Sequence, residues 1–288
     1  MEKYQEKQGK PRVKIPTKAE REKIQTLIAS LGLNTVCREA ACPNIWECFQ
    51  RQTATFMILG DTCTRNCRFC NVKTGHPAPP DPKEPEKVAQ AVQSLKLKYA
   101  VITCVTRDDL PDGGASHFVK VLEAIRKLSP ETRVEILTSD FAGNMAALEK
   151  VLAANPSVFN HNLETVERLT PQLRAKATYQ RSLGVLSYAS RIFPKIPLKS
   201  GLMVGCGESL EEIKETLCDL RRAGVSLLTV GQYLAPDENH YKVAKFYSEE
   251  EFSEIKKYAV ELGFSGVAAG PLVRSSYRAH EMAEGKNG

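Results

Sequence analysis

The chain has 288 residues, of which 42% are hydrophobic and 26% charged, and its formal net charge is +6. This length and composition can bury a substantial core, as one large domain or two small ones. The longest apolar runs, such as YAVITCV, are too short to span a bilayer, and the basic residues are scattered among acids. Composition therefore argues against a membrane protein and a nucleic-acid binder.

The N-terminal segment is polar and basic. MEKYQEKQGK lacks the apolar core of a signal peptide, so we expect a cytoplasmic protein in a reducing environment. Lysines and arginines are densest at residues 3–23, as a solvated arm or as a docking patch for an acidic protein. Thr17 and Glu20 form a capping box that predicts a helix ending at Gly32.

Six of the nine cysteines form two triplets on either side of the first predicted strand. The first has the spacing C-x4-C-x5-C and the second C-x3-C-x2-C; the residues are Cys37, Cys42 and Cys48, then Cys63, Cys67 and Cys70. Three soft thiolates suit a four-iron cluster and leave one iron open to another ligand. Disulfides or a zinc site are the alternatives, but nine is an odd count and only Cys67 and Cys70 form a C-x2-C pair.

Strand-like and helix-like segments alternate along the rest of the chain. We predict strands at 55–60, 99–104, 133–138, 157–160, 199–204, 226–231 and 264–269. We predict helices near 86–96, 115–128, 143–153, 179–191, 209–223 and 248–262. Strict alternation predicts an α/β fold with a parallel sheet and right-handed crossovers. No G-x-G-x-x-G sequence follows the first strand, which favours a partial (β/α)6-type barrel over a dinucleotide-binding fold.

Polar motifs follow the predicted strands at their carboxyl ends. The second triplet follows the first strand, Asp108 and Asp109 follow the second, and His161, Asn162 and Glu164 follow the fourth. Asp108 and Asp109 either line a substrate entrance or cap the helix near residue 115. Barrels place their active sites at this face, so polar motifs confined to the carboxyl ends of the strands predict a single site there.

The spacing C-x3-C-x2-C, with Phe69 before the last cysteine, resembles the signature of the radical S-adenosylmethionine (SAM) enzymes. The resemblance implies that Cys63, Cys67 and Cys70 hold a 4Fe-4S cluster whose open iron binds SAM. Reductive cleavage of SAM then yields a 5′-deoxyadenosyl radical.

Four further features are similar to the lipoyl synthase family, from about residue 17 to 280: the upstream triplet, FNHNLE, KSGLMVG and the terminal RSSY. This resemblance implies insertion of two sulfur atoms at carbons 6 and 8 of an octanoyl chain on a lipoyl carrier protein. It also implies that Cys37, Cys42, Cys48 and a serine of RSSY hold an auxiliary 4Fe-4S cluster that donates sulfur. We favour Ser276 over Ser275, because it adjoins Tyr277.

The same resemblance divides the chain into an N-terminal extension at 1–53, a barrel at 54–270 and a C-terminal segment at 271–288. The two extensions are expected to close the active-site face. Asn162, Glu164 and Arg181 are candidate SAM-binding residues, since an arginine fork suits a carboxylate and Asn or Glu suits ribose hydroxyls. Expected partners are the octanoylated carrier and an electron donor such as ferredoxin or flavodoxin. Two alternatives stay open: another sulfur-inserting radical enzyme, and a non-enzymatic iron–sulfur or zinc scaffold.

Overall fold

A computed structural model of the chain describes residues 33–35, 53–277 and 279–283. The helix predicted at 17–31 and the cysteines Cys37, Cys42 and Cys48 lie outside these residues. None of the helices in the described part of the chain combines the length and apolar composition that crossing a lipid bilayer requires.

One eight-stranded sheet organises the described residues, in the order β1-β2-β5-β6-β7-β8-β9-β10. The pair β1 and β2 is antiparallel, and all other neighbours are parallel. All seven predicted strands are confirmed, each within two residues of its expected ends. The strands are β1 (Asn34–Thr35), β2 (Thr53–Ile58), β5 (Tyr99–Cys104), β6 (Arg133–Leu137), β7 (Val158–Asn160), β8 (Leu198–Val204), β9 (Leu227–Gln232) and β10 (Gly266–Gly270).

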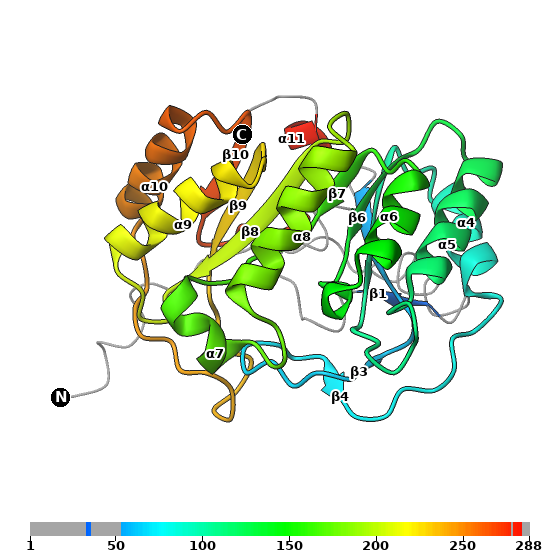
Figure 1. Ribbon diagram of the computed structural model, residues 1–288, viewed down its shortest axis with the longest axis horizontal. Helices are drawn as coiled ribbons and strands as arrows, with labels where there is room; N and C mark the ends of the chain where they lie inside the picture. Colours follow the sequence, from blue (N-terminus) through cyan, green and yellow to red (C-terminus); the bar gives the residue numbers. More distant parts are fainter. Residues whose placement is uncertain (1–32, 36–52, 278, 284–288) are drawn as a thin grey trace, which may run out of the picture.

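Six helices connect the parallel strands and lie along one face of the sheet (Figure 1). All six predicted helices are confirmed, so the α/β partial barrel consists of six strand–helix units followed by β10. The capping box of Ser248 and Glu251 starts the last helix as expected, and Ser209 with Glu212 starts the preceding one. The helices are α4 (Glu84–Ser94), α5 (Ala115–Leu128), α6 (Met145–Ala153), α8 (Tyr179–Ile192), α9 (Leu210–Arg222) and α10 (Glu249–Glu261).

Several short elements were not predicted from the sequence. A two-stranded sheet flanks the second cysteine triplet, and short helices follow β6, β7 and β10. Elements this short carry too few residues for a periodic pattern. They are β1, β3 (Thr62–Cys63), β4 (Lys73–Thr74), η1 (Phe141–Gly143), η2 (Glu167–Leu169), α7 (Thr170–Leu173) and α11 (Ala279–Ala283).

Inside the barrel, one buried carboxylate joins four strands. Glu135 on β6 accepts hydrogen bonds from Tyr99 Oη at 2.9 Å, Asn160 Nδ2 at 3.1 Å and Lys199 Nζ at 3.0 Å. The side chains of Glu135 and Lys199 are 0% exposed. Such a pair is tolerated only because each charge has a partner and further hydrogen bonds satisfy the carboxylate.

Removing one partner of this pair should destabilise the protein strongly. Lys199→Met leaves Glu135 charged and buried, so we expect a loss of about 3–5 kcal/mol in the free energy of unfolding. The double variant Lys199→Met, Glu135→Gln contains no unpaired charge and should recover much of that loss. Denaturant unfolding measures both. As a control, Lys87→Met removes the exposed ion pair with Asp81 and should change stability little.

The C-terminal helix α11 fills the barrel at the end opposite the strands' carboxyl termini. Ala279 packs with Tyr99 and Val101, and Met282 packs with Val158 and Leu227, near the first residues of their strands. The preceding Val273–Ser275 segment lies at the other end, where it lines a cavity. The C-terminal segment therefore lines the cavity at one end of the barrel and fills the core at the other end.

Candidate active site

The chain leaves β2 through a strained residue whose backbone is held on both sides. Leu59 adopts a φ of 69°, a left-handed conformation that non-glycine residues rarely take. Its N–H donates to Glu84 Oε2 at 2.8 Å, and its carbonyl accepts from Arg107 Nη1 at 3.1 Å. His117 pairs with the same Glu84 oxygen at 2.6 Å. These contacts set the direction in which the cysteine loop begins.

The three cysteines of that loop suit an iron–sulfur cluster. Cys63, Cys67 and Cys70 are free thiols, and a backbone amide donates to each sulfur: Arg65 N to Cys63 at 3.4 Å, Ala175 N to Cys67 at 3.4 Å, and Val72 N to Cys70. Amide donors to sulfur are typical of cluster-binding cysteines. Among the described residues no three side chains converge closely enough to hold a single metal ion. A cubane makes no such demand, because each cysteine binds a different iron.

A buried arginine attaches the cysteine loop to two neighbouring strand ends. Arg65 is 5% exposed; it forms a two-pronged ion pair with Asp108 after β5, at 2.8 Å for each bond, and binds Asp140 after β6 at 2.7 Å. Burial alone would raise the pKa of Asp140. The hydrogen bond and the positive charge of Arg65 outweigh that effect and lower this pKa to about 2, so the carboxyl stays ionised. The N-cap residue of helix α5 is Gly114, and the first-turn amide of Ser116 donates to the Asp112 carboxylate at 2.9 Å. Asp108 therefore anchors the loop and does not cap the helix.

A β-bulge between β7 and β8 turns two of the predicted SAM-binding residues towards one cavity. Asn160 pairs with Lys199, and Glu164 pairs with Leu202. Three residues therefore lie between the paired positions after β7, but only two lie between their partners on β8, which is the pattern of a bulge. Glu164 takes a left-handed φ of 69° at this bulge. Asn162 and Glu164 both line the cavity as a result.

The cavity measures about 500 Å³ and lies at the carboxyl ends of the strands, where the sequence predicted the site. Asn162 Oδ1 is buried there without a hydrogen-bond partner in the described structure, and burial raises the pKa of Glu164. A Cβ atom on Gly201 would lie only 2.8 Å from both Asn162 Oδ1 and Thr229 Oγ1. The unsatisfied Asn162 Oδ1 and the absence of a side chain at Gly201 suit a polar ligand that approaches the backbone closely. The other lining residues are Phe69, Cys70, Asn71, Val72, Leu202, Met203, Gly231, Gln232, Tyr233, Leu234, Ala235, Pro236, Val273, Arg274 and Ser275.

Of the two candidate serines, only Ser275 lines this cavity in the described structure. Both are half-buried, in the turn that joins β10 to α11. Ser275 lines the cavity, and the carbonyl of Ser276 accepts from Ala279 N at 3.4 Å. The assignment of Ser276 as cluster ligand stays a prediction, because its proposed cysteine partners lie outside the described residues.

The third predicted SAM-binding residue does not line the described cavity. Arg181 Nη1 donates to Asp140 Oδ2 at 3.1 Å and to the Lys176 carbonyl at 2.9 Å. Through Asp140 it supports Arg65 and the cysteine loop.

Arg174 is a residue that sequence reasoning missed. It caps the short helix α7, and its neighbour Ala175 donates its amide to Cys67 Sγ. Burial raises the pKa of Cys67, while the Ala175 amide and the positive charge of Arg174 oppose that rise. No local pattern marks this arginine, since only the tertiary fold brings it to the cysteine loop.

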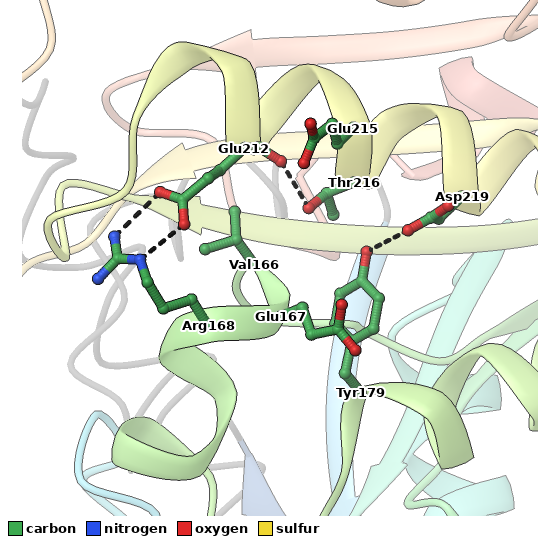
Figure 2. A pocket seen from close by; sticks show the side chains of 8 residues that line it. All are labelled: Val166, Glu167, Arg168, Tyr179, Glu212, Glu215, Thr216 and Asp219. Atoms are coloured by element: carbon green, nitrogen blue, oxygen red, sulfur yellow. Dashed lines mark hydrogen bonds and ion pairs between the residues drawn. The ribbon is translucent and has the colours of Figure 1, made fainter.

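A second hollow, of about 310 Å³, lies on the outer face between η2 and α9 (Figure 2). Its lining is acidic, but three of the carboxylates already have partners: Arg168 pairs with Glu212 at 2.7 Å, Tyr179 Oη donates to Asp219 at 2.9 Å, and Gln180 Nε2 donates to Glu167 at 3.0 Å. We assign no ligand to it.

Comparison with known proteins agrees with this site. Residues 57–220 match the family model of the radical SAM superfamily. A lipoyl synthase of Caldicellulosiruptor saccharolyticus is 52% identical over 273 residues, which cover 95% of this chain and 96% of the relative. A lipoyl synthase of Haemophilus influenzae is 51% identical over 276 residues, covering 95% and 86%.

Solved structures show the same fold. HydG, a maturase of the [FeFe]-hydrogenase, aligns with a TM-score of 0.60 at 14% identity, over 94% of this chain and 67% of its own. SuiB of Streptococcus suis, bound to S-adenosylmethionine, aligns with a TM-score of 0.58 at 13% identity, over 86% of this chain and 54% of its own. The matched cysteine loop and the identity over nearly the whole chain lead to one conclusion: this protein belongs to the lipoyl synthase family of radical SAM enzymes.

Proposed function

We propose that this protein inserts sulfur at carbons 6 and 8 of an octanoyl chain, which is amide-linked to a lysine of a lipoyl carrier protein or domain. One observation carries the proposal. Residues Phe69–Val72 of the cysteine loop and Val273–Ser275 near the C-terminus, far apart in sequence, line the same cavity. A radical generated at one wall of this cavity is therefore close to the segment that carries RSSY.

As a radical SAM enzyme of this family, the chain uses SAM and 4Fe-4S clusters. We assign the radical-generating cluster to Cys63, Cys67 and Cys70, whose sulfurs each accept a backbone amide. We assign the auxiliary, sulfur-donating cluster to the N-terminal extension at 1–53 and the segment at 271–288, with Cys37, Cys42, Cys48 and Ser276 as its ligands. The barrel at 54–270 would then lie between the two.

Asn162 and Glu164 would hold the polar groups of SAM, and Gly201 leaves room for the ligand beside them. Arg181 would act from outside the cavity wall, either on the methionyl carboxylate or through Asp140. When bound, the cluster and SAM supply the carbon radical that abstracts a hydrogen atom from an unactivated C–H bond. The protein's contribution is to position the groups and to exclude water.

The remaining cavity lining suits an alkyl chain. Phe69, Val72, Leu202, Met203 and Leu234 contribute apolar surface to the lining. An octanoyl chain has no polar group along its length, so apolar contacts are what can orient it. The same lining keeps water away from a reactive radical.

The proposed partners follow from the reaction. The substrate is an octanoylated lipoyl carrier protein or domain. Each reductive cleavage of SAM consumes one electron, and two hydrogen abstractions need two SAM molecules. An electron donor such as ferredoxin or flavodoxin would supply those electrons.

A methyl group at position 201 should weaken SAM binding. In Gly201→Ala the new Cβ meets Asn162 Oδ1 and Thr229 Oγ1, and overpacking of this kind costs about 1–3 kcal/mol. We expect the dissociation constant for SAM to rise roughly 5- to 150-fold, measured by equilibrium dialysis with the cluster-loaded protein. Gly184→Ala is the matched control, because nothing lies within 4 Å of a Cβ there. Equal SAM affinity in both variants would contradict the placement of the SAM site beside Gly201.

The proposed reaction is tested by anaerobic turnover of an octanoyl-lysyl peptide with excess SAM and a chemical reductant. Mass spectrometry should detect a product with two added sulfur atoms, at a ratio of two 5′-deoxyadenosines per lipoyl group. A hexanoyl-lysyl peptide is the matched substrate control, because it has no carbon 8 and cannot form the two-sulfur ring. Cleavage of SAM without sulfur incorporation into the octanoyl peptide would contradict the proposal.

A further inference from the structure

Arg174 is bound to the cysteine loop on both sides along the backbone. The carbonyl of Leu173, the residue before it, accepts from Arg68 N at 2.8 Å. The amide of Ala175, the residue after it, donates to Cys67 Sγ at 3.4 Å. Two hydrogen bonds therefore fix the Arg174 backbone beside the loop of Cys63, Cys67 and Cys70.

A chain of hydrogen bonds through Ser182, His161 and the Thr138 carbonyl holds the Arg174 side chain in place. Arg174 Nη1 donates to Ser182 Oγ at 2.9 Å, and Ser182 Oγ lies 3.0 Å from His161 Nε2. His161 Nδ1 lies 2.9 Å from the Thr138 carbonyl, which can only accept, so Nδ1 carries the proton. Nε2 of neutral His161 then accepts from the Ser182 hydroxyl. Burial and the nearby charge of Arg174 lower the pKa of His161 to about 4, which keeps it neutral.

The charge of Arg174 is not cancelled by a direct ion pair. Its guanidinium donates to two neutral oxygens, Ser182 Oγ and the Leu163 carbonyl at 3.1 Å, and no carboxylate among the described residues pairs with it. Arg65 and Arg181, by contrast, both bind Asp140. Glu164 and Asp140 attract Arg174 without forming an ion pair with it, and its charge also acts on the Cys67 sulfur. A charge in a buried environment acts over a longer range than the same charge in water.

We propose that Arg174 is a positioned positive charge that raises the reduction potential of the cluster bound by Cys63, Cys67 and Cys70. Ser182 and His161 hold it in place. Reduction adds one negative charge to the cluster, and a neighbouring cation stabilises the more negative state. This inference rests on the proposed assignment of that cluster to these three cysteines.

The test is the midpoint potential of this cluster, followed by the paramagnetic resonance signal of its reduced form. The full-length chain with Cys37, Cys42 and Cys48 replaced by alanine leaves one cluster to observe. In that background Arg174→Gln should make the equilibrium constant for one-electron reduction at least about tenfold less favourable, a fall of about 59 mV. Arg174→Lys keeps the charge and should stay near the parent value.

Arg168→Gln is the matched charge control. It removes one arginine close by in sequence, but its side chain is 54% exposed and paired with Glu212. Solvent and Glu212 screen that charge, so the midpoint should not move. Equal potentials for Arg174→Gln and the parent would overturn the proposal. Equal shifts in Arg174→Gln and Arg174→Lys would also overturn it, because shape and not charge would then matter.

Ser182→Ala covers the case in which Arg174→Gln fails to assemble the cluster. It leaves every charge in place but removes the anchor, so the potential should fall below that of the parent at unchanged iron content. An unchanged potential would overturn the anchoring role. Absence of any reducible cluster from the parent background would instead contradict the assignment of Cys63, Cys67 and Cys70, which separates the two failures.

Discussion

Replacing Cys63, Cys67 and Cys70 by alanine should abolish reductive cleavage of SAM. Replacing the upstream triplet, Cys37, Cys42 and Cys48, should leave cleavage measurable and eliminate sulfur-containing product. The reason is that one cluster is assigned to generate the radical and the other to supply sulfur. Each triple variant should lose about four iron atoms per chain. The measurements are anaerobic iron counts, 5′-deoxyadenosine formation and the mass of the octanoyl-lysyl peptide.

Cys218→Ala is the cysteine control for both sets. Its thiol lies 3.5 Å from Tyr258 Oη, on the outer helices α9 and α10, so its loss should change neither cleavage nor product. Sulfur insertion at the parent rate by the upstream triple variant would disprove the auxiliary-cluster assignment. Cleavage of SAM by the downstream triple variant would disprove the radical-cluster assignment.

Ser276→Ala should reduce lipoyl formation by at least about 100-fold, the upper end of what loss of a supporting contact around a metal costs. If the Ser276 oxygen closes the auxiliary cluster, its removal leaves one iron without a protein ligand. Ser276→Cys should bind the cluster better, because thiolate is the softer match to iron, but transfer sulfur slowly. Iron content and turnover should therefore change in opposite directions in the cysteine variant.

The same two substitutions at Ser275 are the matched control. Ser275 lines the cavity beside Arg274, so its alanine variant should affect substrate binding more than iron content. Full lipoyl formation by Ser276→Ala, with loss of iron in Ser275→Ala, would move the ligand to Ser275.

Most of the barrel was predictable because its signals are local. Strand β5 is a continuous, mostly apolar run of the kind that parallel sheets bury on both faces, and α5 has helical periodicity. Ser248 and Glu251 form the predicted capping box through contacts three residues apart. Helix α11 has only five residues, and its role inside the barrel depends on distant residues such as Tyr99.

The site was predictable only in part. Asn162 and Glu164 follow β7 as expected, but what turns both towards the cavity is one extra residue in the pairing of β7 with β8. Arg181 was expected to bind SAM from the start of α8, and there it pairs with Asp140. Sequence spacing does not reveal such register and pairing, because they depend on partners about 40 residues away.

The sequence by itself determined the fold class, the cysteine spacing that binds a cluster, and the family, since each rests on the identity and spacing of nearby residues. Only the tertiary structure decided which side chains meet. It placed Val273–Ser275 and Cys70 around one cavity and buried Lys199 against Glu135. It also brought Arg174 to the cysteine loop. Such contacts join strands and loops far apart in the chain, and their energies come from burial and charge pairing that no local pattern contains.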